Sequence, residues 1–398
     1  MDPAKNDSST VCHVVAMPFP GRGHINPMMN LCKLLASRRP AHILVSFVIT
    51  EEWLSFIGSD PKPDNIRFVT VPNVIPSEIG RGKDFPGFIE AVYTKMKAPF
   101  EDLLDRLEPP VTAIATDTYL VWAVGVGNRR NIPVVSLWPM SATVFSVFHH
   151  FELLERNGHF PAEASERGDE LVDYIPGVSP IRFSDLSTIV NGDGRRTLHQ
   201  ALEAVSLASN AQYLLFTSVH ELEARVIDNL KAKFPFPVYA VGPTIPYFEL
   251  QNNASVGHKE VNYLQWLDYQ PTSVVPLSIG GFWTHCGWNS TLEAVFAGVP
   301  MLTFPIFWDQ VPNSKQIVED WKAGWRVKKD LVAENLVTRG EISELLKRFM
   351  DQKCKEGNEV RQAVKELQET CQIAIAKGGS SERNLDALIR GISEHTPR

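Results

Sequence analysis

The sequence lacks long apolar runs. No stretch of about eighteen consecutive apolar residues occurs in the 398-residue chain, so no segment is expected to cross a membrane as a helix. The opening residues, MDPAKNDSST, lack the basic and apolar regions of a secretory signal peptide. These absences predict a cytoplasmic protein without stable membrane insertion.

The chain also lacks an excess of positive charge and a paired set of cysteines. It has 39 Lys and Arg against 46 Asp and Glu, a net charge of -7, which argues against nucleic acid as a partner. The five cysteines, at positions 12, 32, 286, 354 and 371, are odd in number and form no CxxC pair. This pattern favours reduced thiols over a disulfide framework and gives no support for a structural zinc site.

The first part of the chain alternates apolar runs with helical patterns. Amphipathic stretches such as Phe88–Leu107, Ala142–Glu155 and Glu221–Lys233 separate most of the apolar runs. This alternation predicts a parallel sheet with right-handed crossovers, so the expected fold class is α/β. The expected strands are His13–Phe19, Ile43–Thr50, Ile66–Val71, Thr112–Thr116, Val134–Trp138, Gln212–Thr217 and Val238–Val241.

The second part supplies fewer strands. It follows a linker marked by Pro243, Pro246 and the polar run Gln251–Lys259, and the chain length also favours two domains. A mostly helical segment, Glu341–Ser393, follows the expected strands of this part. The expected strands are Ser273–Leu277, Gly281–Thr284, Pro300–Phe304 and Gly324–Val327. A sheet of so few short strands is small for the helices that would cover it.

A histidine and an aspartate are expected at one edge of the first sheet. Residues Phe19–Pro27 join the first strand to the first helix, and His24 lies near the positive end of that helix, which keeps a neutral imidazole available as a base. Asp117 follows the strand Thr112–Thr116 and would fix the tautomer of His24 and stabilise its imidazolium. The alternatives are a turn around His24 and a helix cap at Asp117.

Polar residues also gather at a strand-to-helix turn in the second part. Backbone N–H groups and the helix dipole there would form an anion site suited to a pyrophosphate. The competing interpretation is that Ser290 and Glu293 form a capping box, with Gly298 closing the other end of the helix. The residues of this turn are His285, Trp288, Asn289, Ser290 and Glu293.

Asp309 and Gln310 follow the strand Pro300–Phe304. A carboxylate and an amide at the carboxyl edge of a sheet can receive sugar hydroxyls. The alternative is that both residues merely belong to a loop.

Two other functions have weaker signals. Neither the pair Gly21 and Gly23 nor the pair Gly125 and Gly127 completes the GxGxxG fingerprint, so a dinucleotide oxidoreductase ranks last. The run His149–His150 does not predict a metal site, because adjacent helical residues diverge by about 100°. Aromatic residues on either side of this run are expected in the core or in a pocket wall: Trp138, Phe145, Phe148 and Phe151.

The polar residues of the second part lie in a longer recognisable motif. The run His285–Ser290 (HCGWNS), with Glu293, Gly298–Pro300 and Asp309–Gln310, closely resembles the later part of the donor-binding signature of plant family-1 UDP-glycosyltransferases. The resemblance spans nearly the whole chain. Further matches are Gly21–Pro27 (GRGHINP), Val241–Pro243 (VGP) and Trp266–Pro271 (WLDYQP).

The resemblance implies a GT-B fold, in which two Rossmann-like domains with parallel sheets face each other. Residues 1–242 would form an acceptor-binding domain, 243–262 a linker and 263–378 a truncated UDP-sugar-binding domain. Residues 379–398 would form a C-terminal helix that returns to the first domain.

The resemblance also implies roles for the polar residues. His24 would be the general base, with Asp117 as its partner. The reaction would be an inverting transfer of a hexose to a hydroxyl of a small plant metabolite, such as a phenolic or flavonoid. Gln310 indicates that the hexose is glucose. A UDP-sugar would be co-substrate, with no cofactor or metal. Contacts with the donor would come from His285, Asn289 and Ser290 (diphosphate), Glu293 (ribose), Trp288, and Asp309 and Gln310 (sugar). An acceptor pocket is expected at Trp138, Ser141 and Phe145.

One departure from the family pattern stands out. The strand opening at Val275 is followed almost at once by Ser278–Gly281, which belongs to the middle of the signature, so roughly fifty residues of the family pattern are missing. They would include the Trp that stacks on uracil. The alternative to an active enzyme is therefore a non-catalytic splice form or an incomplete gene model that retains acceptor or partner binding.

Overall fold

A computed structural model of the chain describes residues 11–162, 164–190, 195–245, 280–328 and 336–394. The expected linker beyond residue 245, the strand Ser273–Leu277 and the motif Trp266–Pro271 lie outside these residues. The five cysteines are all described, and none is paired with another.

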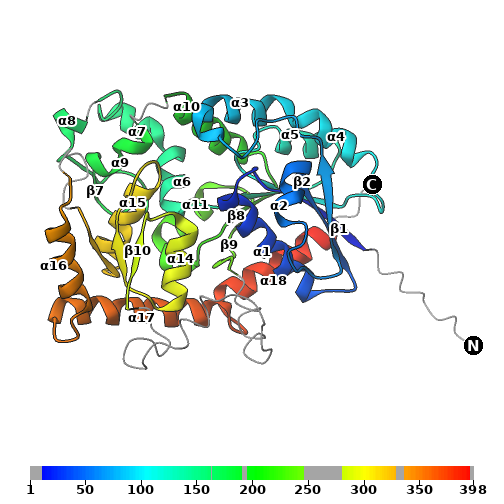
Figure 1. Ribbon diagram of the computed structural model, residues 1–398. Helices are drawn as coiled ribbons and strands as arrows, with labels where there is room; N and C mark the ends of the chain where they lie inside the picture. The colour runs from blue at the N-terminus through cyan, green and yellow to red at the C-terminus, as the bar shows by residue number, and fades with distance from the viewer. Residues whose placement is uncertain (1–10, 163, 191–194, 246–279, 329–335, 395–398) are drawn as a thin grey trace, which may run out of the picture.

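A seven-stranded parallel sheet forms the centre of the first domain (Figure 1). The predicted bounds of β2, β3 and β5 match the structure. β2 and β3 are rich in β-branched residues, and β2 and β5 are almost entirely buried in the sheet. The α/β prediction is confirmed. In spatial order the strands are β3 (Ile66–Val71), β2 (Ile43–Thr50), β1 (Cys12–Met17), β4 (Ala113–Asp117), β5 (Val134–Trp138), β8 (Tyr213–Phe216) and β9 (Val238–Ala240).

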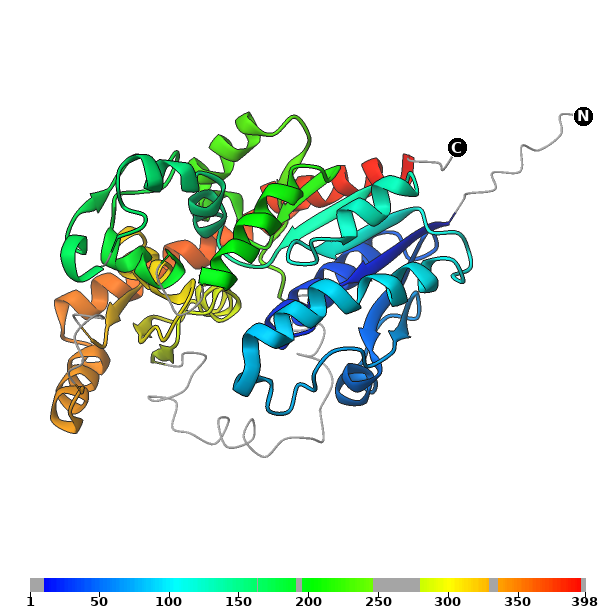
Figure 2. The same ribbon diagram turned by 90° about the horizontal axis from the view of Figure 1, so that it is seen from above.

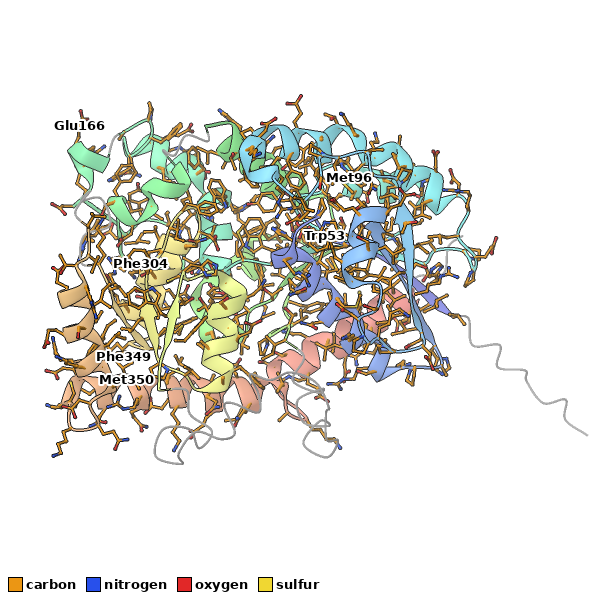
Figure 3. The ribbon with its side chains drawn as sticks, in the orientation of Figure 1. Trp53, Met96, Glu166, Phe304, Phe349 and Met350 are labelled. Atoms are coloured by element: carbon orange, nitrogen blue, oxygen red, sulfur yellow. The ribbon has the colours of Figure 1, made fainter. Side chains whose placement is uncertain are left out.

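Helices cover both faces of this sheet. On one face lie α1 (Arg22–Arg38) and α2 (Glu51–Ile57), and on the other α3 (Phe85–Lys95), α4 (Lys97–Leu104) and α5 (Ala123–Arg129). Figure 3 shows Trp53 of α2 and Met96, between α3 and α4, inside this domain. The short turns η1 (Arg81–Asp84) and η2 (His220–Leu222) lie before α3 and α11 (Ala224–Lys233).

A group of helices extends the first domain over the second. It contains a two-stranded antiparallel ribbon, β6 (Leu171–Val172) with β7 (Ile181–Arg182), and packs around one apolar cluster that includes Trp138, Phe145, Phe148 and Phe151. The helices are α6 (Ala142–His149), α7 (Phe151–Arg156), α8 (Ala164–Arg167), α9 (Phe183–Val190) and α10 (Arg195–Ala208).

The predicted helical stretch Phe88–Leu107 is two helices instead of one. The break lies at Met96, between α3 and α4. Pro99 falls in the first turn of α4, where its missing N–H costs little, but it could not donate to the carbonyl of Lys95 in a continuous helix. The proline therefore sets the start of the second helix.

The second sheet has three short parallel strands in the described residues. They are β10 (Phe282–Thr284), β11 (Met301–Thr303) and β12 (Gly324–Arg326), in that order. The connecting helices are α14 (Trp288–Ala297), α15 (Gln310–Lys315) and the π-helical turn η3 (Gln316–Asp320). Each strand is shorter than the apolar run that predicted it.

Three helices follow the second sheet: α16 (Arg339–Met350), α17 (Lys355–Ile375) and α18 (Ser380–Glu394). A capping box between Thr338 and Glu341 begins α16, and Phe349 near its end packs beside the small sheet (Figure 3). Helix α17 packs on α14. Helix α18 then crosses back to the first domain (Figures 1 and 2).

The return of α18 is driven by an apolar stripe. Leu385, Leu388, Ile389 and Ile392 recur at helical spacing and are buried in the same core as α1 and the first sheet. Hydrogen bonds flank the stripe: Asn384 Nδ2 donates to the Ala240 carbonyl at 2.8 Å, and Arg38 pairs with Glu382 at 3.0 Å. The helix therefore completes the core of the first domain.

The two domains share an apolar core. Val219 and Leu222 of the first domain pack in one cluster with Trp288 and Leu292 of α14 and Val364 of α17. Two polar links add to it. Buried Lys315 donates to Ser179 Oγ and pairs with Asp320, both at 2.6 Å. Arg326 lies 3.4 Å from Asp185 of α9.

Among the described residues, no helix is both long enough and apolar enough to cross a bilayer.

The packing of α18 yields a first prediction. Leu388→Ala should lower the free energy of unfolding by about 2–5 kcal/mol, because it leaves a cavity where α18 meets the first sheet. Urea unfolding measures the loss. The matched control is Ile373→Ala on α17, whose residue is 70% exposed and should change stability by less than about 0.5 kcal/mol. Equal losses in the two variants would contradict the role of the stripe.

Candidate active site

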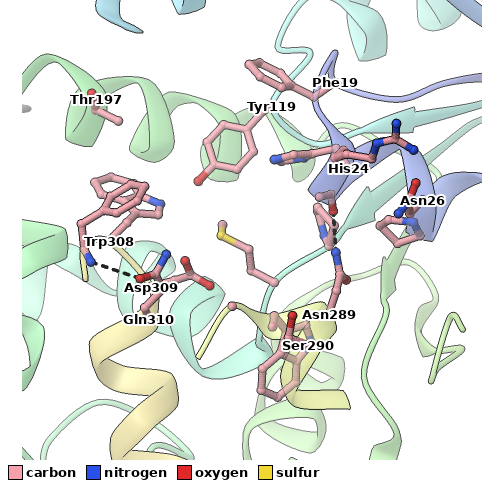
Figure 4. A pocket seen from close by; sticks show the side chains of 18 of the residues that line it. Phe19, His24, Asn26, Tyr119, Thr197, Asn289, Ser290, Trp308, Asp309 and Gln310 are labelled. Carbon is pink, nitrogen blue, oxygen red and sulfur yellow. Dashed lines mark hydrogen bonds between the residues drawn. The ribbon is translucent and has the colours of Figure 1, made fainter. Parts of the chain in front are cut away.

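A cleft of about 920 Å³ lies between the two domains. The loops that follow β1 and β4 line it from the first domain, and the loops that follow β10 and β11 line it from the second. Both sheets therefore present their carboxyl edges to the same space, where open α/β sheets bind ligands. Figure 4 shows His24 and Tyr119 on one side of this space and Asn289, Ser290, Asp309 and Gln310 on the other.

His24 and Asp117 meet at the first edge. His24 lies in the first turn of α1, and its Nδ1 is 2.7 Å from Asp117 Oδ2. Asp117 is the last residue of β4 and is fully buried. An ionised carboxylate only accepts, so the pair places the proton of a neutral imidazole on Nδ1 and leaves the lone pair on Nε2.

Asp117 also caps the following turn. Its Oδ1 accepts a hydrogen bond from the Tyr119 backbone N–H at 2.9 Å, while Oδ2 faces His24. The two alternatives for Asp117, a cap and a partner of His24, therefore hold together. The cap fixes the carboxylate, and the fixed carboxylate orients the imidazole.

The capping-box interpretation of Ser290 and Glu293 is wrong. Helix α14 has Gly287 as its N-cap, without a side-chain cap, so Ser290 and Glu293 lie inside the helix. Both side chains line the cleft instead. Gly298 does close the helix, in the left-handed conformation with φ 69°.

The first turn of α14 carries the polar residues predicted for it. His285, Trp288, Asn289, Ser290 and Glu293 all line the cleft. A Cβ on Gly287 would meet His285 Nε2 at 2.4 Å, so a larger residue there would displace the His285 ring. Free backbone N–H groups at such a helix start attract anions.

Asn289 makes a further hydrogen bond, and Glu293 has a shifted pKa. Asn289 Nδ2 donates to the Gly23 carbonyl of the first domain at 2.7 Å, next to His24 in sequence. Burial raises the pKa of the Glu293 carboxyl. The Asn289 bond joins the two sides of the cleft beside His24.

Asp309 and Gln310 lie at the start of α15 and line the cleft. Asp309 Oδ2 accepts from Asn313 Nδ2 at 2.9 Å. Burial raises the pKa of Asp309 to about 6, against the opposing effects of the Asn313 hydrogen bond and of nearby His24. Gln310 Oε1 accepts from the backbone N–H groups of Ile306 and Phe307, so its amide N–H groups are left for the cleft.

The prediction of Trp138, Ser141 and Phe145 as an acceptor pocket is wrong. All three are fully buried and do not line the cleft. Trp138 and Phe145 belong to the apolar core, and Ser141 caps α6. Tyr119 stacks on Trp138 at 5.3 Å between ring centroids and takes the place at the cleft instead.

Several residues of the cleft were not predicted. Tyr119 lies two residues after Asp117 in the same loop, so the position of this loop could have predicted Tyr119 as a residue of the cleft. Trp308 precedes Asp309 and has an unusual φ of 56°, which no sequence pattern signals. Residues of the acceptor side come from separate helices and share no motif: Phe85, Ile89, Tyr93, Ile189, Leu198 and Gln200.

No group of three or more His, Cys, Asp or Glu side chains in the described part of the chain is arranged to hold a metal ion. His149 packs on Phe234, and His150 Nδ1 lies 3.0 Å from the Ser146 carbonyl. The two histidines therefore serve the core.

Comparison with known proteins decides the family. A family model described as UDP-glucoronosyl and UDP-glucosyl transferase matches residues 264–361. UDP-glycosyltransferase 87A2 of Arabidopsis thaliana is 46% identical, in an alignment that covers 99% of each chain. The chain belongs to the plant family-1 UDP-glycosyltransferases. It is a glycosyltransferase that uses a UDP-sugar as co-substrate.

Further relatives agree. UDP-glycosyltransferase 87A1 of Arabidopsis thaliana is also 46% identical, over 95% of this chain and 100% of the relative. The 7-deoxyloganetin glucosyltransferase of Catharanthus roseus is 27% identical, over 97% of this chain and 98% of the relative.

Solved structures show the fold. A UDP-glucosyltransferase from Polygonum tinctorium, capable of glucosylating indoxyl and solved with 3,4-dichloroaniline, has a TM-score of 0.79 and 23% identity, over 98% of this chain and 100% of that one. UGT2 of Phytolacca americana, solved with UDP-2fluoro-glucose and pterostilbene, has a TM-score of 0.78 and 21% identity, over 96% and 100%. The glycosyltransferase therefore has the GT-B fold.

The alignment also shows that this glycosyltransferase is short. Its alignment with UDP-glycosyltransferase 87A2 spans 459 positions, 61 more than the 398 residues of the chain. At least that many positions of the alignment have no residue here. The predicted shortfall of roughly fifty residues agrees with this difference.

The shifted pKa of Asp309 gives a second prediction. The folded pKa of about 6 lies above the ordinary 3.8, so the ionised carboxylate destabilises the folded state and stability falls as pH rises from about 4 to 6. Asp309→Asn removes this effect. Relative to the wild type, the variant should gain about 1 kcal/mol between pH 5 and pH 7.5 in urea unfolding. Exposed Asp102→Asn is the control and should show no such gain.

Proposed function

We propose that this glycosyltransferase transfers a hexose, glucose by preference, from a UDP-sugar to a hydroxyl of a small aromatic plant metabolite, such as a phenolic or flavonoid, with inversion at the anomeric carbon. The observation that carries the proposal is the His24–Asp117 pair, which faces the start of α14 across the cleft. A base and an anion site on opposite sides suit attack by an acceptor hydroxyl on a sugar whose leaving group is a diphosphate.

The base side performs the first half of the reaction. The acceptor hydroxyl gives its proton to His24 Nε2, and its oxygen attacks C1 of the sugar as the bond from C1 to UDP breaks on the opposite face. Asp117 stabilises the imidazolium because its carboxylate lies 2.7 Å from Nδ1. The product is the inverted glycoside, with UDP as the leaving group.

The donor side stabilises the leaving diphosphate. In the proposed arrangement, His285, Asn289 and Ser290 contact the phosphates together with the N–H groups that begin α14, and Glu293 contacts the ribose. Trp288 borders the same site. The two sugar contacts are Asp309, which accepts from hydroxyls when ionised, and Gln310, whose free amide N–H groups donate.

The acceptor side supports an aromatic acceptor. Its wall is built from Phe19, Phe85, Ile89, Tyr93, Met140 and Leu198. Apolar walls with few polar groups favour flat aromatic ligands. The solved relatives hold molecules of this kind, 3,4-dichloroaniline and pterostilbene.

The proposal assigns acceptor binding to residues 1–242, a linker to 243–262, donor binding to 263–378 and a returning helix to 379–398. It includes a cytosolic location, as expected from the unpaired cysteines. The missing positions bear on the donor side. Loss of an aromatic stack on uracil would weaken UDP binding by about 1–3 kcal/mol.

The experiment that tests the function is release of UDP. Purified protein with UDP-glucose and a phenolic acceptor should release UDP, and UDP alone should raise the melting temperature. A protein that shows neither effect would refute the proposal and leave the non-catalytic alternative. UDP-galactose in place of UDP-glucose tests the sugar, for which slower release is expected.

A third prediction separates catalysis from donor binding. His24→Ala should lower kcat by about a hundred- to ten-thousand-fold, because the general base is lost, while stabilisation by UDP is retained. Steady-state UDP release and thermal shifts measure the two effects. The matched control is the exposed His42→Ala, which should leave both unchanged. Full activity of the His24 variant would eliminate it as the base.

A further inference from the structure

Tyr119 occupies a distinctive place beside the base. Its ring lies edge-on to His24, with 6.1 Å between ring centroids and an angle of 84°, and it stacks on Trp138. Its own backbone N–H is held by Asp117, the partner of His24. Both the conformation of the loop and the plane of the ring are therefore fixed, and the hydroxyl is directed into the cleft (Figure 4).

The hydroxyl of Tyr119 has a proton without an acceptor. Its oxygen is buried, and no described residue accepts a hydrogen bond from it. The Trp308 side chain approaches this oxygen as a donor, and an indole N–H cannot accept. Burial raises the pKa of this hydroxyl well above its usual value, so the proton stays in place. A buried donor left in this state costs free energy until a ligand supplies an acceptor.

The position of this proton favours the acceptor molecule over the sugar. Tyr119 belongs to the first domain and packs on Phe19 as well as on His24. Asp309, the proposed sugar contact, also lies near enough for its charge to raise the pKa of the Tyr119 hydroxyl, so this hydroxyl stands where the acceptor side meets the sugar side. Because the Tyr119 ring lies beside the His24 ring, an oxygen that meets the Tyr119 hydroxyl would lie in the same part of the cleft as the oxygen that meets His24 Nε2.

We propose that Tyr119 is a specificity-determining residue, whose hydroxyl donates a hydrogen bond to a second oxygen of the acceptor, adjacent to the hydroxyl that reacts. The favoured acceptors are aromatic molecules with neighbouring oxygens, such as catechols and ortho-hydroxycarbonyl compounds. Acceptors with one isolated hydroxyl leave the Tyr119 proton unpaired and bind more weakly. The proposal rests on the proposed function, because His24 is taken as the base that meets the reacting hydroxyl.

The test compares two acceptors of the same ring system, 2,3-dihydroxynaphthalene and 2-naphthol. Their dissociation constants are measured by calorimetry in the presence of UDP, and kcat/KM is measured by UDP release. The wild type should favour the dihydroxy compound by about tenfold in both quantities. Tyr119→Phe should abolish this preference by weakening the dihydroxy compound, with little change for 2-naphthol.

The matched control is Tyr93→Phe. Tyr93 lines the same cleft, but its hydroxyl already donates to the Gln200 carbonyl at 3.3 Å. Its replacement removes the same atom from the cleft and should leave the preference between the two acceptors intact. A preference lost equally in both variants would overturn the proposal, because it would reflect a general loss of packing.

Binding and turnover separate this proposal from the proposed function. If the wild type binds the two compounds equally, or if Tyr119→Phe keeps the preference, the selection by Tyr119 is refuted whatever the turnover. If the preference in binding depends on Tyr119 but no UDP is released, the selection stands and the transfer reaction fails. A change in the KM for UDP-glucose alone would place the Tyr119 contact on the sugar and refute the proposal.

Discussion

The shared apolar core is the constraint on which the active site depends. Val219 and Leu222 of the first domain are buried with Trp288, Leu292 and Val364 of the second, so the two domains are packed against each other. Hydrophobic burial does not by itself fix the relative orientation of two domains. Polar contacts across the same boundary fix this orientation, above all the hydrogen bond from Asn289 to the Gly23 carbonyl. Together they hold His24 and the start of α14 at opposite walls of one cleft.

The electrostatics of the cleft follow from which groups are buried. Asp117 is buried, and its Oδ2 lies 2.7 Å from His24 Nδ1 while its Oδ1 accepts from the Tyr119 backbone N–H. Asp309 is also buried, and burial raises its pKa to about 6 against the opposing effects of the Asn313 hydrogen bond and of nearby His24. The carboxyl of Asp309 therefore titrates close to the physiological range.

Much of this arrangement could be predicted from the sequence. Short, largely apolar runs predicted the bounds of β2, β3 and β5, and the ends of the predicted strands located His24 and Asp117 at one edge. The predictions failed where one sequence pattern fits two alternative local structures. Ser290 and Glu293 match a capping box, yet Gly287 starts the helix earlier. Trp138 was expected in the core or in a pocket wall, and the sequence could not show that Tyr119 stacks on it and lines the cleft in its place, because this contact joins the loop that follows β4 to the end of β5.

The return of α18 has a consequence for synthesis. Leu385, Leu388, Ile389 and Ile392 complete the core of the first domain, yet they are made after the second domain. On the ribosome, the part of this apolar face that α18 covers, beside α1, must therefore stay exposed until these residues emerge. Domains usually fold in order as they are made, but here the first domain is sealed last. The newly made chain is in that interval a natural client for chaperones.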